Sequence, residues 1–250
     1  MTLILIKLGG SVLTDKAIPF SFDHQVTRRL SSEIKDTRDD IIVVHGGGSF
    51  GHPGAKRYGL NTPEPEDISR GTAEVQRDMR KMNQIVLEIM LEEGINAISV
   101  PGGLVSRYRD GDLVSLDEDT FLDYLAIGTT PVTFGDVALD ETRGVTICSG
   151  DDIMSRMAYL ADMSVFVTNV DGIFKNGVVA ERFTRDMLPL TKKDMPENSK
   201  TIDVTGSMER KLELMLDMSK HCDTYVVNGL VPGRLRSILD GEPTLCTVVE

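Results

Sequence analysis

Short apolar runs recur along the chain, and several of them end in glycine. Runs rich in Ile, Val and Leu are typical of strands buried on both faces of a parallel sheet. The run 3–8 shows this most clearly, because Gly9 and Gly10 follow it directly. We expect strands at 3–8, 41–44, 97–100, 131–134, 137–139, 145–148, 164–168, 225–227 and 245–249.

Between these runs, the apolar residues follow a helical period. Val26, Leu30 and Ile34 recur every four residues, which places them on one face of an amphipathic helix. The same kind of spacing over 68–93 predicts a long helix with methionines along its apolar side. We expect helices at 22–35, 68–93, 119–127, 152–160 and 208–220, and a loop rich in Asn, Asp and Gly at 169–179.

The alternation of strands and helices predicts an α/β fold with a largely parallel sheet. The pattern restarts near residue 145 with a new helix and strand, and no flexible linker separates the two halves. We therefore expect two lobes, 1–145 and 146–250, that share one continuous sheet. A single undivided domain is the alternative, since 250 residues suit either arrangement.

The composition narrows the range of partners. The chain has 27 Lys and Arg against 39 Asp and Glu, a formal net charge of −12. So acidic a surface argues against non-specific binding to nucleic acid or to anionic membranes. The apolar runs are much shorter than the roughly 20 residues that span a bilayer. The 3 cysteines form no close pair, which excludes a disulfide scaffold and favours a cytoplasmic protein.

Glycine-rich turns follow the first two expected strands. Lys-Leu-Gly-Gly-Ser occupies 7–11, and His-Gly-Gly-Gly-Ser-Phe-Gly-His occupies 45–52. Glycines at the end of a strand let backbone N–H groups approach an anion, and a helix that begins there adds its dipole. The second segment is not a P-loop, since no Gly-Lys-Ser/Thr follows. The triple glycine is the stronger candidate for a phosphate cradle, whereas Gly9-Gly10 alone is more typical of a tight turn.

Three further turns carry polar residues. They are Ser-Gly-Asp-Asp at 149–152, Thr-Asn-Val-Asp-Gly at 168–172 and Val-Thr-Gly-Ser-Met at 204–208. An aspartate at a helix N-terminus is also a common cap, and Asp-Gly is also a simple turn. The lysines near the glycine turns are Lys7, Lys16 and Lys211. On an acidic protein they suggest a cluster for a multiply charged phosphate, although Lys16 alone is typical of a solvated loop.

Together and in this order, these motifs resemble those of the amino acid kinase superfamily, over nearly the whole chain from Lys7 to Lys211. Within it, Phe-Gly-His at 50–52 and the lysine of Leu-Thr-Asp-Lys at 13–16 are similar to the isopentenyl phosphate kinases. The resemblance implies a three-layer αβα sandwich of two lobes. It also implies ATP-dependent conversion of isopentenyl phosphate to isopentenyl diphosphate, a step of an alternative mevalonate route typical of archaea.

The resemblance implies roles for individual residues. Lys16 would stabilise the transferring group, and Lys7 and Lys211 would bind ATP phosphate oxygens. His52 would bind the acceptor phosphate, and Asp151 would orient Lys7 and Lys16. The residues assigned to ATP are Lys7, Gly9, Gly10, Ser11, Gly48, Asp171, Gly206 and Lys211. The residues assigned to the acceptor phosphate are Gly47, His52 and Gly150.

The same resemblance makes 1–145 the acceptor-binding lobe and 146–250 the nucleotide-binding lobe, in a homodimer. Mg²⁺ would arrive with ATP, because no carboxylate cluster has metal-ligand spacing. The chain departs from the family pattern at Ser207, where a second glycine is usual, and at Arg210, where a small residue is common. A serine Cβ at position 207 would displace a phosphate that approached this backbone closely.

The tail of the acceptor needs an apolar slot. Thr72 and Val75, with Ile68 and Met79, share one face of the expected helix 68–93, although the same spacing is typical of core residues. A kinase of the same fold with another small acceptor, such as a phosphonate or a carboxylate, would keep the ATP residues and change this slot. A non-catalytic anion-binding protein is the more distant alternative.

Overall fold

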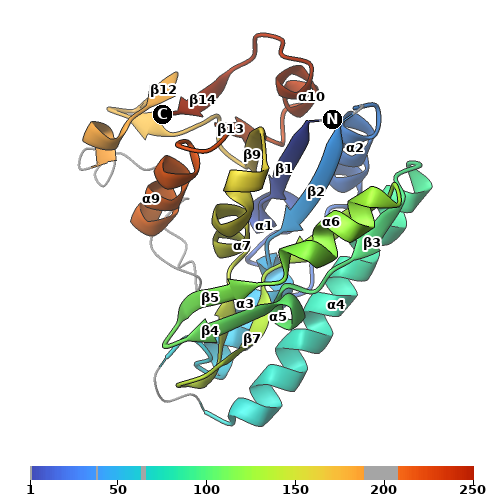
Figure 1. Ribbon diagram of the computed structural model, residues 1–250, viewed down its shortest axis with the longest axis vertical. Coiled ribbons are helices and arrows are strands. Elements are labelled where there is room, and N and C mark those ends of the chain that lie inside the picture. Colours follow the sequence, from blue (N-terminus) through green and yellow to red (C-terminus); the bar gives the residue numbers. More distant parts are fainter. Residues whose placement is uncertain (1, 38, 63–65, 189–207) are drawn as a thin grey trace.

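A single large sheet organises the molecule (Figure 1). The computed structural model describes residues 2–37, 39–62, 66–188 and 208–250. Among these, 8 strands pair in the order β12-β14-β13-β9-β1-β2-β6-β3. The strands are β1 (Leu3–Leu8), β2 (Asp40–His45), β3 (Ala97–Ser99), β6 (Thr130–Phe134), β9 (Met163–Thr168), β12 (Arg182–Phe183), β13 (Asp223–Asn228) and β14 (Cys246–Val249). All neighbours are parallel except β13 and β14.

The central strands are apolar on both faces because helices cover both. Ile4 and Ile6 of β1 face one hydrophobic cluster, whereas Leu3 and Leu5 face the other. This alternation follows from the two-residue period of a strand. It also explains the continuous apolar run at 3–8, and it confirms the expected α/β class with a largely parallel sheet.

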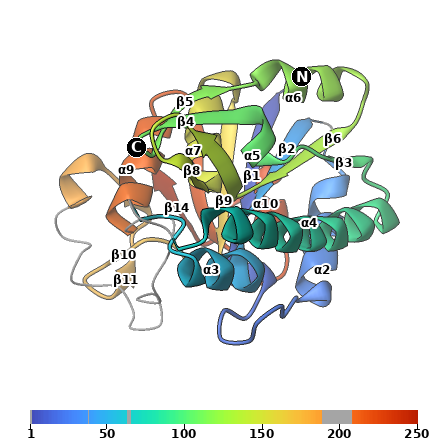
Figure 2. The ribbon, with the colours of Figure 1, turned by 90° about the horizontal axis from the view of Figure 1, so that it is seen from below.

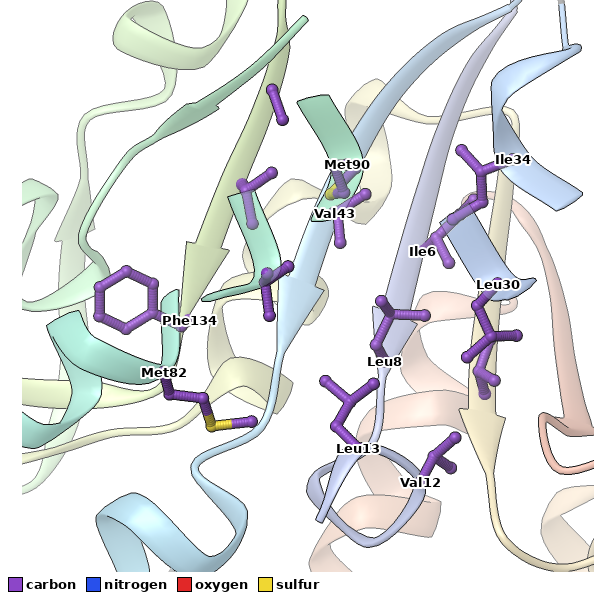
Figure 3. Packing of buried hydrophobic residues seen from close by; sticks show 14 of the residues in the cluster. Ile6, Leu8, Val12, Leu13, Leu30, Ile34, Val43, Met82, Met90 and Phe134 are labelled. Atoms are coloured by element: carbon purple, nitrogen blue, oxygen red, sulfur yellow. The ribbon is translucent and has the colours of Figure 1, made fainter. Parts of the chain in front are cut away.

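Four described helices of six or more residues cover the first face, as Figure 2 shows below the sheet. They are α2 (His24–Lys35), α3 (Gly48–Arg57), α4 (Ile68–Glu92) and α10 (Arg234–Leu239). Figure 3 shows Leu30 and Ile34 of α2 packed toward Ile6 and Leu8 of β1. The residues that recur every four positions therefore face the core, as the sequence predicts.

The opposite face carries α6 (Glu118–Ala126), α7 (Gly150–Met157), the 3₁₀ turn η1 (Ala158–Leu160) and α9 (Met208–Met218). Phe121 of α6 and Ile153 of α7 are fully buried against strand residues such as Ile42 and Val44. Helices on both faces confirm the three-layer αβα sandwich. None of the described helices has the length and apolar character needed to cross a bilayer.

A smaller sheet of 4 strands lies beside the main one, in the order β5-β4-β7-β8. Its strands are β4 (Ser106–Arg109), β5 (Asp112–Leu116), β7 (Asp136–Asp140) and β8 (Gly144–Cys148). The first two were not expected, because their sequences are largely polar and half of β4 is exposed. The remaining short elements are α1 (Gly10–Leu13), α5 (Gly102–Val105), β10 (Phe174–Lys175), β11 (Val178–Val179) and η2 (Arg185–Met187).

Two expectations need correction. The segment 169–179 is not only a loop, since β10 and β11 form a short antiparallel hairpin within it. The helix expected to reach 220 ends at Met218, where a turn begins. The main sheet is continuous through the pairing of β1 with β9, so both predicted lobes contribute strands to it. The assignment of 1–145 to the acceptor and 146–250 to the nucleotide stays a prediction.

Candidate active site

The glycine turns that follow β1 and β2 touch each other through their backbones. A Cβ built on Gly10 would lie 2.6 Å from the N atom of Gly48, and one on Gly46 would lie 2.7 Å from the N atom of Gly10. Neither distance leaves room for any side chain. The glycines therefore allow the carboxyl ends of two adjacent parallel strands, and the helices that start there, to meet at one point.

Helix N-termini gather at this point. Gly48 begins α3, and Gly150 begins α7 beside Val44 and the Cε atom of Lys7. The first N–H groups of a helix have no partner within it and carry partial positive charge. The Gly47 and Gly48 N–H groups donate to no other described residue. The arrangement suits an anion with several oxygens.

Thr14, which sequence reasoning missed, locks the two turns together. Its hydroxyl donates to the Gly10 carbonyl at 2.7 Å and accepts from the Ser49 N–H at 3.0 Å. Gly48 has a φ of +47° and lies so close to Thr14 that a Cβ would overlap its side chain. Only glycine fits there without strain. Thr14 stands in the Leu-Thr-Asp-Lys motif, which is the signal that could have singled it out.

Lys7 and Asp151 form an ion pair in the centre of the site. Their side chains are 13% and 6% exposed, so little water screens the pair. Burial raises the pKa of the Asp151 carboxyl, but the charges of Lys7 and Lys211 and the bonds from Lys7 and Ser149 outweigh it, and the net shift is downward. The ion pair agrees with the expected effect of Asp151 on Lys7, and its expected effect on Lys16 stays a prediction.

Three more titratable side chains lie near this pair, and its charges shift their pKa values. They are Lys16, Lys211 and His52. Burial, helped by Lys7 and Lys16, lowers the pKa of Lys211 to about 8. Burial and the charge of Lys7 also lower the pKa of Lys16. Burial and the charges of the lysines lower the pKa of His52 to about 4, so its imidazole is neutral near pH 7. The structure thus brings the three lysines and the histidine together in a locally basic site.

A small cavity opens beside His52. Its volume is about 40 Å³, and its lining includes Gly47, His52, Val75, Met79, Ile147 and Cys148. A Cβ built on Gly51 would lie 2.8 Å from the Met79 sulfur, and one on Gly47 would lie 3.4 Å from it, so α4 packs tightly against the start of α3. Of the predicted slot residues, Val75 lines the cavity whereas Thr72 does not. The Thr72 hydroxyl is buried and has no hydrogen-bond partner among the described residues.

The residues predicted to bind the nucleotide are more scattered. Ser11 donates to Asn169 at 3.2 Å, which joins the end of β1 to the end of β9. Gly9 lets the turn after β1 pass the Val167 carbonyl closely, since a Cβ would lie 2.8 Å from that oxygen. Gly206, like Ser207, lies outside the described residues. These contacts support the turn geometry but leave the nucleotide roles as predictions.

Asp171 and Arg210 each have partners that the sequence did not indicate. Asp171 accepts from Asn228 at 3.0 Å and from Arg234 at 2.5 Å, and these two bonds lower the pKa of its carboxyl. Asn228 ends β13 and precedes a glycine, the same strand-end signal as in the other turns. Arg210 donates to Asp152 at 2.9 Å, which ties the first turn of α9 to the first turn of α7.

The described residues contain no group of three or more His, Cys, Asp or Glu side chains arranged to hold a metal ion. The carboxylate nearest the lysines, Asp151, is already engaged by Lys7. The site offers positive charge and N–H donors, which fit phosphate oxygens. A divalent ion that entered with a polyphosphate would find most of its oxygen ligands on that polyphosphate.

Comparison with known proteins shows which family the chain resembles over nearly its whole length. A model of the amino acid kinase family matches residues 2–228. The isopentenyl phosphate kinase of Methanocaldococcus jannaschii is 32% identical over 256 residues, covering 96% of each chain. That of Thermoplasma acidophilum is 35% identical over 244 residues, covering 94% of this chain and 96% of the relative. A crystal structure of an isopentenyl phosphate kinase substrate complex superposes with a TM-score of 0.81, at 32% identity and full coverage of both chains.

Proposed function

Because this chain belongs to the amino acid kinase family, we propose that it transfers the γ-phosphoryl group of ATP to isopentenyl phosphate, forming isopentenyl diphosphate. The observation that carries the proposal is the position of His52, which lies near the three partly buried lysines and lines a small apolar cavity. One side of this histidine suits a phosphate and the other suits a hydrocarbon tail. The acceptor must therefore carry both.

The reaction needs no general base. An alkyl monophosphate has a second pKa near roughly 6, so it is already a dianionic nucleophile at neutral pH. The difficulty is to bring two anions together and to stabilise the charge on the transferring group. Lys7, Lys16 and Lys211 supply that charge, and the N–H groups at the starts of α3 and α7 add oriented dipoles. Asp151 holds Lys7 in place.

His52 is proposed to bind the acceptor phosphate as a neutral donor. Its pKa is lowered to about 4, so the ring is neutral at pH 7 and keeps one N–H group that can donate to the phosphate. The Gly47 N–H lies at the same cavity and supplies a second donor. The prenyl tail is proposed to extend past them toward Val75, Met79 and Ile147. These apolar side chains disfavour a carboxylate or an amide at that end of the acceptor.

ATP is proposed to bind at the turns after β1 and β9, with Mg²⁺ on its phosphates. Lys7, Lys211 and Gly48 face the polyphosphate in this proposal, and Asp171 with Arg234 lies at its nucleoside end. Magnesium would neutralise part of the phosphate charge when bound. We also propose a homodimer and a cytoplasmic location. The latter rests on the 3 cysteines of the chain, which are all free.

A coupled assay of ADP release tests the proposal. The acceptors are isopentenyl phosphate, dimethylallyl phosphate, fosfomycin and N-acetylglutamate. We expect the highest kcat/KM with isopentenyl phosphate and at least about a hundredfold less with N-acetylglutamate, because a buried carboxylate and amide would lose hydrogen bonds to water. Lys16→Met is the control for contaminating kinases. A preference for fosfomycin or N-acetylglutamate would replace the prenyl acceptor, and no turnover with any of them would favour a binding protein.

A further inference from the structure

His45 is a buried histidine that the proposed reaction does not use. It is the last residue of β2, directly before the triple glycine, and its side chain is fully buried. Its ring stacks on Phe134, with 5.0 Å between the ring centroids and 18° between the planes. Stacking alone would suit a phenylalanine equally well. Both ring nitrogens, however, have polar partners.

The partners of His45 determine the direction of every hydrogen bond around it. Nδ1 lies 3.2 Å from the Gly46 carbonyl oxygen, which can only accept, so Nδ1 carries the proton. Burial lowers the pKa of His45 to about 4, so the ring is neutral and Nε2 must accept. Nε2 lies 3.2 Å from Asn83 Nδ2, which donates. The remaining Asn83 Oδ1 accepts from Ser99 at 2.6 Å.

This chain of bonds acts on the peptide that joins Gly46 to Gly47. A trans peptide is planar, so its C=O and N–H groups point in opposite directions. When His45 holds the Gly46 carbonyl, the Gly47 N–H is turned away from the histidine. That N–H donates to no other described residue, and Gly47 lines the cavity beside His52. Glycines on both sides of this peptide give it little resistance to rotation.

We propose that His45 is a positioning residue, which Asn83 and Ser99 hold in its Nδ1–H form so that it directs the Gly47 N–H toward the acceptor phosphate. The phosphate contact rests on the proposed function, whereas the hydrogen-bond relay does not. Asn83 lies on α4 and Ser99 on β3, so the relay ties the phosphate turn to two elements that are distant in sequence. The histidine thus keeps a flexible glycine turn in one orientation.

The tautomer is the first test. Chains labelled with ¹⁵N-histidine are studied by two-bond ¹H–¹⁵N correlation at pH 7, and His45→Phe identifies the His45 signals among those of the 4 histidines. We expect a protonated Nδ1 and an unprotonated Nε2 at His45. An Nε2–H tautomer would overturn the proposal, because Nδ1 could not then donate to the Gly46 carbonyl. An imidazolium would also overturn it, because Nε2 could not then accept from Asn83.

The second test separates positioning from stability. His45→Phe keeps an aromatic ring on Phe134 but removes the donor. We expect its KM for isopentenyl phosphate to rise at least about tenfold while its KM for ATP stays within about twofold. Val43→Ala is the matched control, because Val43 is equally buried on the same strand and lies outside the relay. Equal KM values in His45→Phe and the control would overturn the proposal.

Asn83→Ala removes the donor to Nε2, so either ring nitrogen of His45 can carry the proton. We expect about a threefold rise in KM for the acceptor. Binding of inorganic phosphate, followed by the Gly47 amide signal, needs no turnover. We expect at least about tenfold weaker phosphate binding in His45→Phe than in Val43→Ala. Phosphate binding without isopentenyl phosphate turnover in the wild type would count against the proposed function and leave the relay standing.

Discussion

The turn after β2 and the turn after β9 both end buried parallel strands, yet they are built differently. In the first, His45, Ser49 and Phe50 are buried, and backbone groups and a threonine hydroxyl make the contacts. In the second, the Asp171 side chain is 40% exposed and is held by the long Arg234 side chain. One turn is therefore shaped by packing, and the other is held by partly exposed polar side chains.

This difference predicts two kinds of specificity. On the side of β2, substitutions change cavity shape and core packing together, so acceptor selectivity and folding stability are coupled. On the side of β9, where we propose that the nucleotide binds, the contacts are charged and hydrogen-bonded, so we expect substitutions to alter nucleotide affinity with less effect on stability.

The largest effect is expected at Lys16. Lys16→Met keeps the length of the side chain and removes its charge. If Lys16 acts mainly on the transition state, kcat falls about a hundredfold or more while ATP affinity changes little. Steady-state kinetics with saturating acceptor, and nucleotide binding by calorimetry, measure the two quantities. An unchanged kcat would return Lys16 to the role of a solvated loop residue.

His52 probes the acceptor side alone. His52→Ala is expected to raise the KM for isopentenyl phosphate by about ten- to a hundredfold, because the phosphate loses an N–H donor. His52→Gln supplies a side-chain N–H and should retain part of the binding. The KM for ATP is the internal control and should not change. Equal losses in the two variants would mean that ring shape, rather than donation, is the role of His52.

Lys211 gives the nucleotide side a pH dependence. Its pKa is about 8, below the usual value of 10.5, so it loses its charge as the pH rises through about 8. If ATP needs the charged form, its KM rises about tenfold between pH 7 and pH 9. Lys211→Arg stays charged throughout and should flatten the profile. A profile that is equally steep in Lys211→Arg would assign the titration to another group.

Substitutions in the cavity that change the accepted tail length should have the smallest effect on kcat/KM, and they should also change folding stability. Met79→Ala and Val75→Ala enlarge the cavity and should increase kcat/KM for geranyl phosphate relative to isopentenyl phosphate by several-fold, since each buried CH₂ contributes about 0.8 kcal/mol. Thr72→Phe should shorten the accepted tail. Thermal unfolding is measured in parallel. A constant ratio with lower stability would mean that these side chains are ordinary core, and the tail would lie near Val132, Val137 or Ile147.

The amino-acid sequence alone determined most of the framework. The strand at 3–8 and the helix beginning at Ile68 appear where the spacing of apolar residues predicts them. Each element buries its apolar residues at the spacing of its own geometry, so this signal can be read from a short stretch of sequence. The glycine turns were also predicted from the sequence, since several glycines directly after an apolar run are typical of a tight turn at the end of a strand. By contrast, β4 and β5 escaped prediction because their polar residues become strands only by pairing with each other and with β7.

Tertiary structure decided which of the candidate residues meet. Thr72, Val75 and Met79 share one helical face in the sequence, but the close crossing of α3 over α4 brings only Val75 and Met79 to the cavity. Likewise, the ion pair of Lys7 with Asp151 and the hydrogen bond from Arg210 to Asp152 join residues that lie far apart in the sequence. The spacing of apolar residues determines which face of a helix or strand a residue occupies. The residues that it contacts there depend on how elements distant in the sequence pack together.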